Sequence, residues 1–193
     1  LVMVPKNSGS DPIIDDFTLT SEDGALVNGG GNEGGSDTPS GDTGLSETFA
    51  SNSQGEFTIV DVNLPSALTY VWSTTASYGM KASAYKSSNY ASESWLISPA
   101  FSLKEALNFL NGNVMGDFVS VLVSTNYNGS NPSAATWSKL TLNTLPDGKS
   151  YTYVTTTADM SVVANQEKVY LAFKYVSTSS CAPTWEIKNL VVK

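Results

Sequence analysis

From residue 45 onward the chain alternates short apolar runs with clusters of turn residues, and this pattern most limits the folds it can adopt. Runs such as LTYVWST and KVYLAFKYV are rich in β-branched and aromatic residues, and clusters such as NYNGSNPS and LPDGKS separate them. Many short strands at this spacing are typical of antiparallel sandwiches and not of βαβ units. The sequence therefore predicts an all-β fold, a two-sheet β-sandwich of the jelly-roll type.

Alternation within the runs predicts which strands are most buried. In KVYLAFKYV, residues 168–176, one face is entirely apolar or aromatic and the other is mixed. The first face consists of Val169, Leu171, Phe173 and Tyr175. In FVSVLVS, residues 118–124, apolar residues occupy both faces, so we expect this strand in the interior of its sheet.

The stretch ASESWLISPAFSLKEALNF, residues 91–109, contains a predicted strand break. Pro99 has no N–H to donate to a ladder, so one strand should end beside it and another should begin in AFSL. The segment SLKEALNFL is short for a helix, and its context favours a strand. Trp95, Trp137 and Trp185 lie within apolar strand patterns and are expected in the core, whereas Tyr127 is expected partly exposed at a flexible hairpin tip.

Three segments of different composition follow one another along the 193 residues. Residues 24–44 are dense in Gly, Ser, Asp and Thr and cannot bury enough surface to order themselves, so we interpret them as a flexible Gly-rich linker. Residues 1–23 are interpreted as the tail of a preceding β domain or, alternatively, as an N-terminal arm that adds a strand to the main domain. Residues 45–193 form the predicted sandwich domain.

Residue types that the chain lacks disfavour several functional classes. It contains no His and no Arg, and its ten basic residues are all Lys. Without His, neither a Ser-His-Asp nor a Cys-His nucleophile system can be built, and with Cys181 as the single cysteine a zinc site is disfavoured. The net charge of −8 disfavours nucleic-acid binding, which needs a basic face.

Membrane and export signals are also absent from the sequence. No apolar run reaches the roughly 18 residues needed to span a bilayer as a helix. The opening LVMVPKNSGS lacks the basic region and the apolar core of a signal peptide. An acidic surface fits a secreted protein. We expect an extracellular or outer-membrane surface location, with the signal or lipid anchor lying outside this sequence.

Aromatic residues gather in a turn-rich stretch between residues 70 and 90. Trp72, Tyr78, Tyr85 and Tyr90 are interspersed there with Ser, Thr and Asn. Carbohydrate sites combine exposed aromatic faces with hydroxyl and amide groups that orient the sugar. We therefore predict a ligand-binding surface at these four residues. The alternative is that Trp72 and Tyr78 plug the sandwich or cover its edge.

Several ordered motifs between residues 45 and 193 carry a resemblance to a known family. They are ESWLISPAFSL, VSVLVSTNYNG, Trp137, KVYLAFKY and TWEIKNLVVK. With these motifs the chain resembles the choice-of-anchor J family, which is related to the cleaved adhesin domains of bacterial surface proteases and, more distantly, to MAM-type jelly rolls. SETFASNSQGEFTIVDVNLP and YGMKASAY look like the version found in surface lipoproteins of gut Bacteroidetes. The resemblance implies a non-catalytic accessory module.

The resemblance also implies a structural calcium site. The related adhesin domains bind Ca2+ near their first and last strands, and the matching residues here are Glu47, Glu93 and Asn189. Calcium takes six to eight oxygen ligands, which separated strand ends can supply. The closing motif reads IKN where the family usually offers aspartates, and Lys188 would repel a cation. The alternative is that the three residues are ordinary hydrogen-bonded polar side chains.

These observations predict a non-catalytic, surface-exposed adhesion or carbohydrate-binding module of an exported bacterial lipoprotein, and not an enzyme. The expected partner is a glycan or a surface protein, the latter recognised by strand addition at a sheet edge. The alternative is a structural spacer or a protein–protein interaction domain without a small ligand. A hydrolase would instead place two acids across a cleft, and the candidates are Glu47, Glu56, Glu93 and Glu186.

Overall fold

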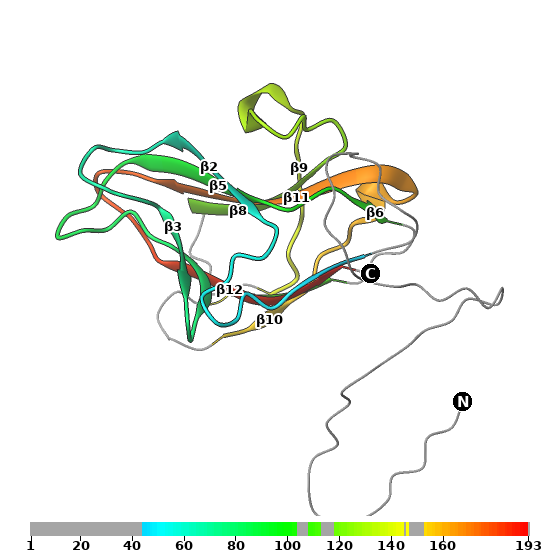
Figure 1. Cartoon of the computed structure of the whole chain (residues 1–193), viewed down its shortest axis with the longest axis horizontal. Coiled ribbons are helices and arrows are strands. Elements are labelled where there is room, and N and C mark those ends of the chain that lie inside the picture. The colour runs from blue at the N-terminus through cyan, green and yellow to red at the C-terminus, as the bar shows by residue number, and fades with distance from the viewer. Residues whose placement is uncertain (1–43, 104–107, 113–117, 145, 147–152, 193) are drawn as a thin grey trace, which may run out of the picture. The chain divides into compact units, whose positions relative to one another are not determined.

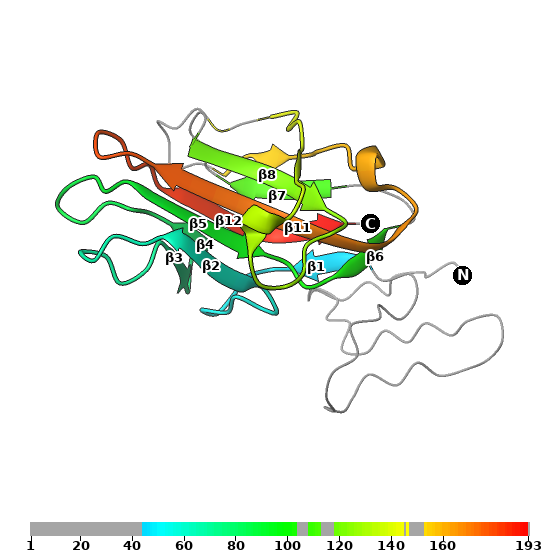
Figure 2. The ribbon, with the colours of Figure 1, turned by 90° about the horizontal axis from the view of Figure 1, so that it is seen from above.

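The predicted all-β sandwich is confirmed. The computed structural model describes residues 44–103, 108–112, 118–144, 146 and 153–192, and in these ranges the chain forms two antiparallel six-stranded sheets. Figure 1 shows the sheets stacked as two layers, and Figure 2 shows the strands running along a common direction. The predicted N-terminal arm, residues 1–23, and the linker up to residue 43 lie outside the described residues.

The first sheet, called the β12 sheet after its central strand, has the order β10-β7-β12-β4-β3, with β1 also pairing with β12. Its strands are β1 (Leu45–Glu47), β3 (Trp72–Thr75), β4 (Gly79–Ala82), β7 (Asn108–Gly112), β10 (Thr155–Thr156) and β12 (Trp185–Val192). The first strand of the domain therefore lies beside the last one, as a jelly roll requires.

The second sheet, called the β11 sheet, has the order β2-β5-β11-β8-β9, with β6 also pairing with β11. Its strands are β2 (Thr58–Asn63), β5 (Ser92–Ile97), β6 (Phe101–Leu103), β8 (Val119–Ser124), β9 (Ser138–Lys139) and β11 (Gln166–Ser177). The connections include the short 3-10 helices η2 (Pro132–Ala134) and η3 (Ser161–Val163). No helix in the described ranges has the length and apolar character to cross a membrane.

The strand break at Pro99 is confirmed, and a serine repairs the ladder there. β5 ends at Ile97 and β6 begins at Phe101. Between them, the Ser98 N–H donates to the Leu171 carbonyl at 2.9 Å, and the Ser98 hydroxyl accepts the Leu171 N–H at 2.9 Å. Because Ser98 meets both polar groups of Leu171, β11 continues unbroken while its partner strand changes from β5 to β6.

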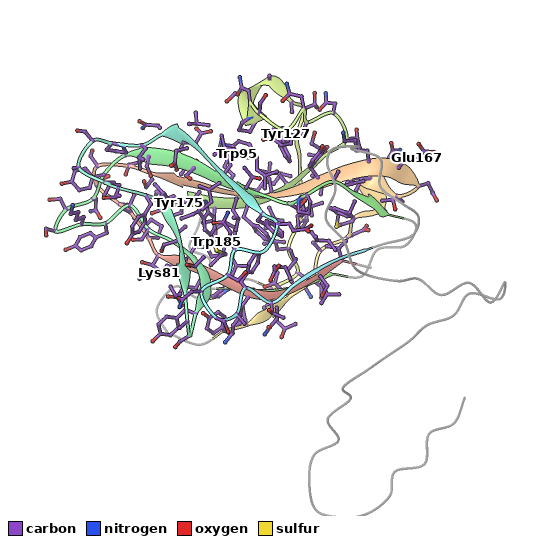
Figure 3. All side chains as sticks on the ribbon, in the orientation of Figure 1. Lys81, Trp95, Tyr127, Glu167, Tyr175 and Trp185 are labelled. Atoms are coloured by element: carbon purple, nitrogen blue, oxygen red, sulfur yellow. The ribbon has the colours of Figure 1, made fainter. Side chains whose placement is uncertain are left out.

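The main core lies between the sheets and contains the face of β11 that the alternation predicts. Val169, Leu171, Phe173 and Tyr175 are all less than 2% exposed. The Phe173 ring lies 5.6 Å from that of Trp185, which in turn lies 5.6 Å from Trp72. Figure 3 shows Tyr175 and Trp185 between the two layers. The interior position of β8, between β11 and β9, is also confirmed.

A second apolar cluster covers the outer face of the β11 sheet. It consists of Trp95, Ile97, Leu122, Tyr127, Tyr170 and Ala172. The loop between β8 and β9, residues 125–137, folds over this face, and Figure 3 shows Tyr127 beneath that loop. The expectation of a partly exposed Tyr127 is wrong, because its ring is only 5% exposed and packs edge-on against Tyr170 at 5.1 Å.

Candidate ligand-binding groove

A groove with a volume of about 500 Å³ lies on the outer face of the β12 sheet, at the edge formed by β3 and β4. We call it the Tyr70–Tyr85 groove. Its lining consists of Leu68, Thr69, Tyr70, Val71, Ser73, Lys81, Ser83, Tyr85, Lys86 and Thr184. The residues come from the β3–β4 hairpin and the segments on either side of it, together with Thr184, which directly precedes β12.

Strand alternation builds the polar floor of the groove. Trp72 on β3 and Met80 and Ala82 on β4 point inward and are at most 2% exposed. The residues between them therefore point outward, and Ser73 and Lys81 are opposite each other in the ladder. Figure 3 shows Lys81 on the outside of this hairpin.

The tight turn of the hairpin depends on Gly79. Its φ of +74° lies in the left-handed region, where a residue with a Cβ is strained. A Cβ at this position would also collide with the carbonyl oxygen of Ile187 on the neighbouring strand. Gly79 therefore lets β4 approach β12 closely at this end of the hairpin.

Two exposed tyrosines stand on the walls of the groove. Tyr70 is 58% exposed and Tyr85 is 60% exposed. The Ser83 N–H donates to the Val71 carbonyl at 3.0 Å, so the segments that carry the two rings are held together at their base. Tyr85 also pairs with Asn89 in an isolated bridge. The rings are therefore carried on backbone that is fixed by hydrogen bonds.

The lining of the groove is positively charged and contains no carboxylate among the described residues. The Lys86 ammonium donates to the Ala67 carbonyl at 3.1 Å, which spans the two walls. Glu186 lies opposite Lys81 in the β4–β12 ladder, but it is engaged elsewhere, within 3.1 Å of the Tyr153 hydroxyl. Burial, followed by the negative charge of Glu186, raises the pKa of Tyr153.

The structure distributes the four predicted aromatic residues over different environments. Tyr85 lines the groove. Tyr78 is exposed, but it lies at the tip of the β3–β4 hairpin, at the end opposite to the groove. Tyr90 is half-buried, and Trp72 is 2% exposed in the main core. The four residues therefore do not form one surface, and the alternative that Trp72 plugs the sandwich describes its position.

Sequence reasoning missed Tyr70 as the partner of Tyr85. Tyr70 precedes β3, which begins at Trp72, so it lies in irregular chain where alternation predicts no direction. In a regular strand, Tyr70 and Trp72 would lie on the same face because they are two residues apart. In the structure Tyr70 is exposed and Trp72 is buried. The available signal was compositional, since Tyr70 lies at the start of the same aromatic-rich stretch.

The three predicted calcium ligands do not form one site. Glu47 and Asn189 lie on the paired strands β1 and β12, whereas Glu93 lies on β5 in the other sheet. Glu93 accepts the Trp95 indole N–H at 2.9 Å and pairs with the Lys174 ammonium at 3.1 Å. A carboxylate that is already neutralised by a lysine is a poor calcium ligand.

Local backbone bonds hold the other two residues. Glu47 accepts the Phe49 N–H at 2.8 Å and lines a smaller hollow of about 270 Å³ together with Glu56. The Asn189 N–H donates to the Thr48 carbonyl at 3.3 Å, and its φ of 54° marks an irregularity where β12 passes β1. The described residues thus join Glu47 with Glu56 and not with Glu93, so the predicted set does not fit a shared Ca2+ ion.

Comparison with known proteins identifies relatives of the fold. No protein-family model and no curated protein matches the chain. Among solved structures, the K3 cleaved adhesin domain of Lys-gingipain from Porphyromonas gingivalis W83 is similar, with a TM-score of 0.55, 15% identity, and coverage of 77% of this chain and 96% of that one. The K2 cleaved adhesin domain of Lys-gingipain is also similar in fold, with a TM-score of 0.53, 15% identity, and coverage of 78% of this chain and 99% of that one.

The comparison confirms the coarser part of the resemblance drawn from sequence, which is an adhesin-like β-sandwich. At 15% identity the likeness concerns the fold alone. A shared fold hosts unrelated functions, so function has to be argued from the groove itself.

Proposed function

We propose that residues 45–193 form a non-catalytic carbohydrate-binding module that acts in adhesion at a bacterial surface, with the sugar bound in the Tyr70–Tyr85 groove. The pair of exposed tyrosines on the walls of a polar groove carries this proposal. Exposed aromatic faces pack against the apolar faces of sugar rings, and hydroxyl groups on the floor orient the sugar.

The groove suits binding better than hydrolysis. Glycoside hydrolysis needs two carboxyl groups on either side of the scissile bond. Among the described residues, the groove lining has hydroxyl, phenol and ammonium groups but no carboxylate. Of the acids considered from sequence, Glu93 is paired with Lys174 and Glu186 is within hydrogen-bonding distance of Tyr153. Glu47 accepts the Phe49 N–H and shares the smaller hollow with Glu56, away from the groove. None of these four acids lines the groove, which supports a binding role for it.

The proposed setting follows from the sequence motifs. They resemble the choice-of-anchor J modules of surface lipoproteins in gut Bacteroidetes, so the proposal includes an exported chain held at the outer surface. In that setting, residues 1–23 would belong to a preceding β domain and residues 24–44 would serve as its linker. A rigid sandwich then presents the groove while the linker supplies reach.

Two tyrosine substitutions test the groove. We expect Tyr70→Ala and Tyr85→Ala each to weaken glycan binding by about tenfold, because an aromatic contact of this kind contributes roughly 1 kcal/mol or slightly more. A glycan array with the wild-type protein selects the ligand, and calorimetric titration measures the loss. Tyr78→Ala is the matched control, since it removes an equally exposed tyrosine at the far end of the hairpin.

Absence of any glycan ligand on the array contradicts the proposal. Equal losses in Tyr78→Ala and Tyr85→Ala would also contradict it, because the binding energy would then not belong to the groove.

Protein recognition by strand addition is the second candidate. Among the described residues, β2 pairs only with β5 and so forms one edge of the β11 sheet. Val62 on this strand is 45% exposed and Leu64 beyond it is 36% exposed, which makes the edge apolar. One variant distinguishes the two functions. Val62→Lys adds a charge to this edge and leaves the groove, on the other sheet, unchanged.

A further inference from the structure

The charge of the groove is opposite to that of the molecule. The chain carries 18 acidic and 10 basic residues, for a net charge of −8. Within the described part of the chain, the groove lining nevertheless contains two lysines and no acid. Most of this negative charge lies in residues 1–44, whereas residues 45–193 carry ten acidic and nine basic residues. The groove is therefore a local cationic patch on a nearly neutral domain.

Both lysines are available to a ligand. Lys81 projects from the floor, half-buried between the walls, and Lys86 is exposed at the rim. Among the described residues, neither groove lysine forms an ion pair. The ion pair seen there joins Lys174 to Glu93 on the other sheet. The hydrogen bond from Lys86 to the Ala67 carbonyl uses one of its three N–H groups and fixes its position.

Hydroxyl groups lie beside the charge. The hydroxyls of Ser83, directly after β4, and Thr184, directly before β12, are 3.4 Å apart. Ser73 lies opposite Lys81 on the floor. The groove thus combines two cations, a cluster of hydroxyls and two aromatic faces.

We propose that the Tyr70–Tyr85 groove selects an anionic sugar, with Lys81 and Lys86 pairing to its acidic group; this inference rests on the proposed function. The tyrosine rings pack on the sugar ring, the hydroxyls of Ser83 and Thr184 bond to its hydroxyl groups, and the ammonium groups bind the anion. Lysine acts as a point charge without a fixed fork geometry, so a carboxylate and a sulfate are both acceptable to it.

A pair of ligands that differ only in charge tests the inference. Oligogalacturonate and its methyl ester share one backbone, but only the first is anionic. We expect the wild-type protein to bind oligogalacturonate at least fivefold more tightly than the ester, with a preference that shrinks as salt is added. Chondroitin sulfate, titrated in parallel, separates recognition of sulfate from recognition of carboxylate.

Lysine variants locate the preference. Lys81→Met and Lys86→Met should each weaken oligogalacturonate binding by roughly two- to fivefold and weaken binding of the methyl ester by less, so that the preference for the anion shrinks. Lys139→Met is the matched control, because it makes the same change in net charge at an exposed position on β9 of the other sheet. It should leave both affinities unchanged.

The outcomes separate this inference from the proposed function. Equal affinities for oligogalacturonate and its ester, or binding to neutral glycans on the array and to neither anionic probe, would overturn the anionic preference while glycan binding stands. An equal loss in Lys139→Met would assign the effect to net charge and also overturn it. If neither a neutral nor an anionic glycan binds the wild-type protein, both the proposed function and this inference fail.

Discussion

At the scale of single residues, Trp72 shows how one side chain can belong to the core and not to a ligand surface. Its indole is 2% exposed, lies 5.6 Å from the Trp185 ring, and donates its N–H to the Ser94 carbonyl at 3.4 Å. Trp72 is on the β12 sheet and Ser94 on the β11 sheet. This one side chain therefore joins both layers directly beneath the floor of the groove.

We predict that Trp72→Ala lowers the free energy of unfolding by about 3–5 kcal/mol, since it leaves a large cavity between the sheets. Trp72→Phe keeps an aromatic ring and should cost less. Urea unfolding followed by circular dichroism measures both. Tyr78→Ala, at an exposed position, should change the unfolding free energy by no more than about 0.5 kcal/mol. Similar values for Trp72→Ala and Tyr78→Ala would show that Trp72 is not part of the core.

At the scale of elements, β11 organises its sheet. Its residues Tyr170 to Tyr175 pair with β8, and most of the same stretch pairs with β5 on the opposite side. Apolar clusters cover it on both faces, one between the sheets and one beneath the loop of residues 125–137. β9, by contrast, has two residues and forms an edge.

Hydrogen exchange should follow this arrangement. We expect the amides of Leu171 to Tyr175 to be the slowest to exchange, since they open only with the whole domain, and those of β2 and β9 to be among the fastest strand amides. Exchange followed by NMR gives the rates residue by residue. Fast exchange in the centre of β11 would mean that the sheet opens locally and is not one cooperative unit.

How much of this arrangement the sequence predicts depends on how regular the backbone is in each segment. The alternation in β11 and the proline after β5 predicted the strand faces and the break, because both act through local backbone geometry. Irregular chain carries no such signal, and for that reason Tyr70 was missed and Tyr127 was expected at the surface. Tyr127 is covered by a loop that returns across the sheet. This tertiary contact leaves no periodic pattern in the sequence.

How well the sequence predicts the site depends on the same distinction between regular and irregular segments. The aromatic composition of residues 70–90 indicated the correct part of the chain, and Tyr85 lines the groove. Composition cannot tell which ring faces outward, so the buried Trp72 was grouped with the exposed Tyr78 and Tyr85. The electrostatic character of the groove was beyond sequence reasoning, because Lys81, Lys86 and Thr184 meet only through the pairing of β4 with β12.

At the scale of the whole molecule, buried phenols tie stability to alkaline pH. Burial, and to a smaller extent the charge of Cys181, raises the pKa of Tyr175, although the Ala84 N–H partly opposes the shift. The Tyr175 hydroxyl also donates to the Pro183 carbonyl at 2.6 Å. Burial likewise raises the pKa of Tyr127. In the folded protein these phenols therefore stay protonated at a pH where they ionise in the unfolded chain.

The sign of the effect follows from proton counting. Above the ordinary tyrosine pKa of 10.0 the unfolded chain binds fewer protons than the folded one, so stability falls as pH rises. We expect the free energy of unfolding to change little on this account below about pH 9 and to decline as the pH rises above about 10. Urea unfolding across this range measures the decline, and Tyr175→Phe should make it shallower. A slope that Tyr175→Phe leaves unchanged would contradict the assignment.

The covered outer face of the β11 sheet allows the domain to be immobilised in a defined orientation, with this face as its back and the β12 sheet as its front. The loop of residues 125–137 occupies the back, and the groove opens on the sheet at the front. Ser130, exposed on that loop, is therefore a suitable point for a single engineered cysteine, provided that Cys181 is first replaced by serine. Coupled there, every molecule on a sensor chip would present the groove to the solution.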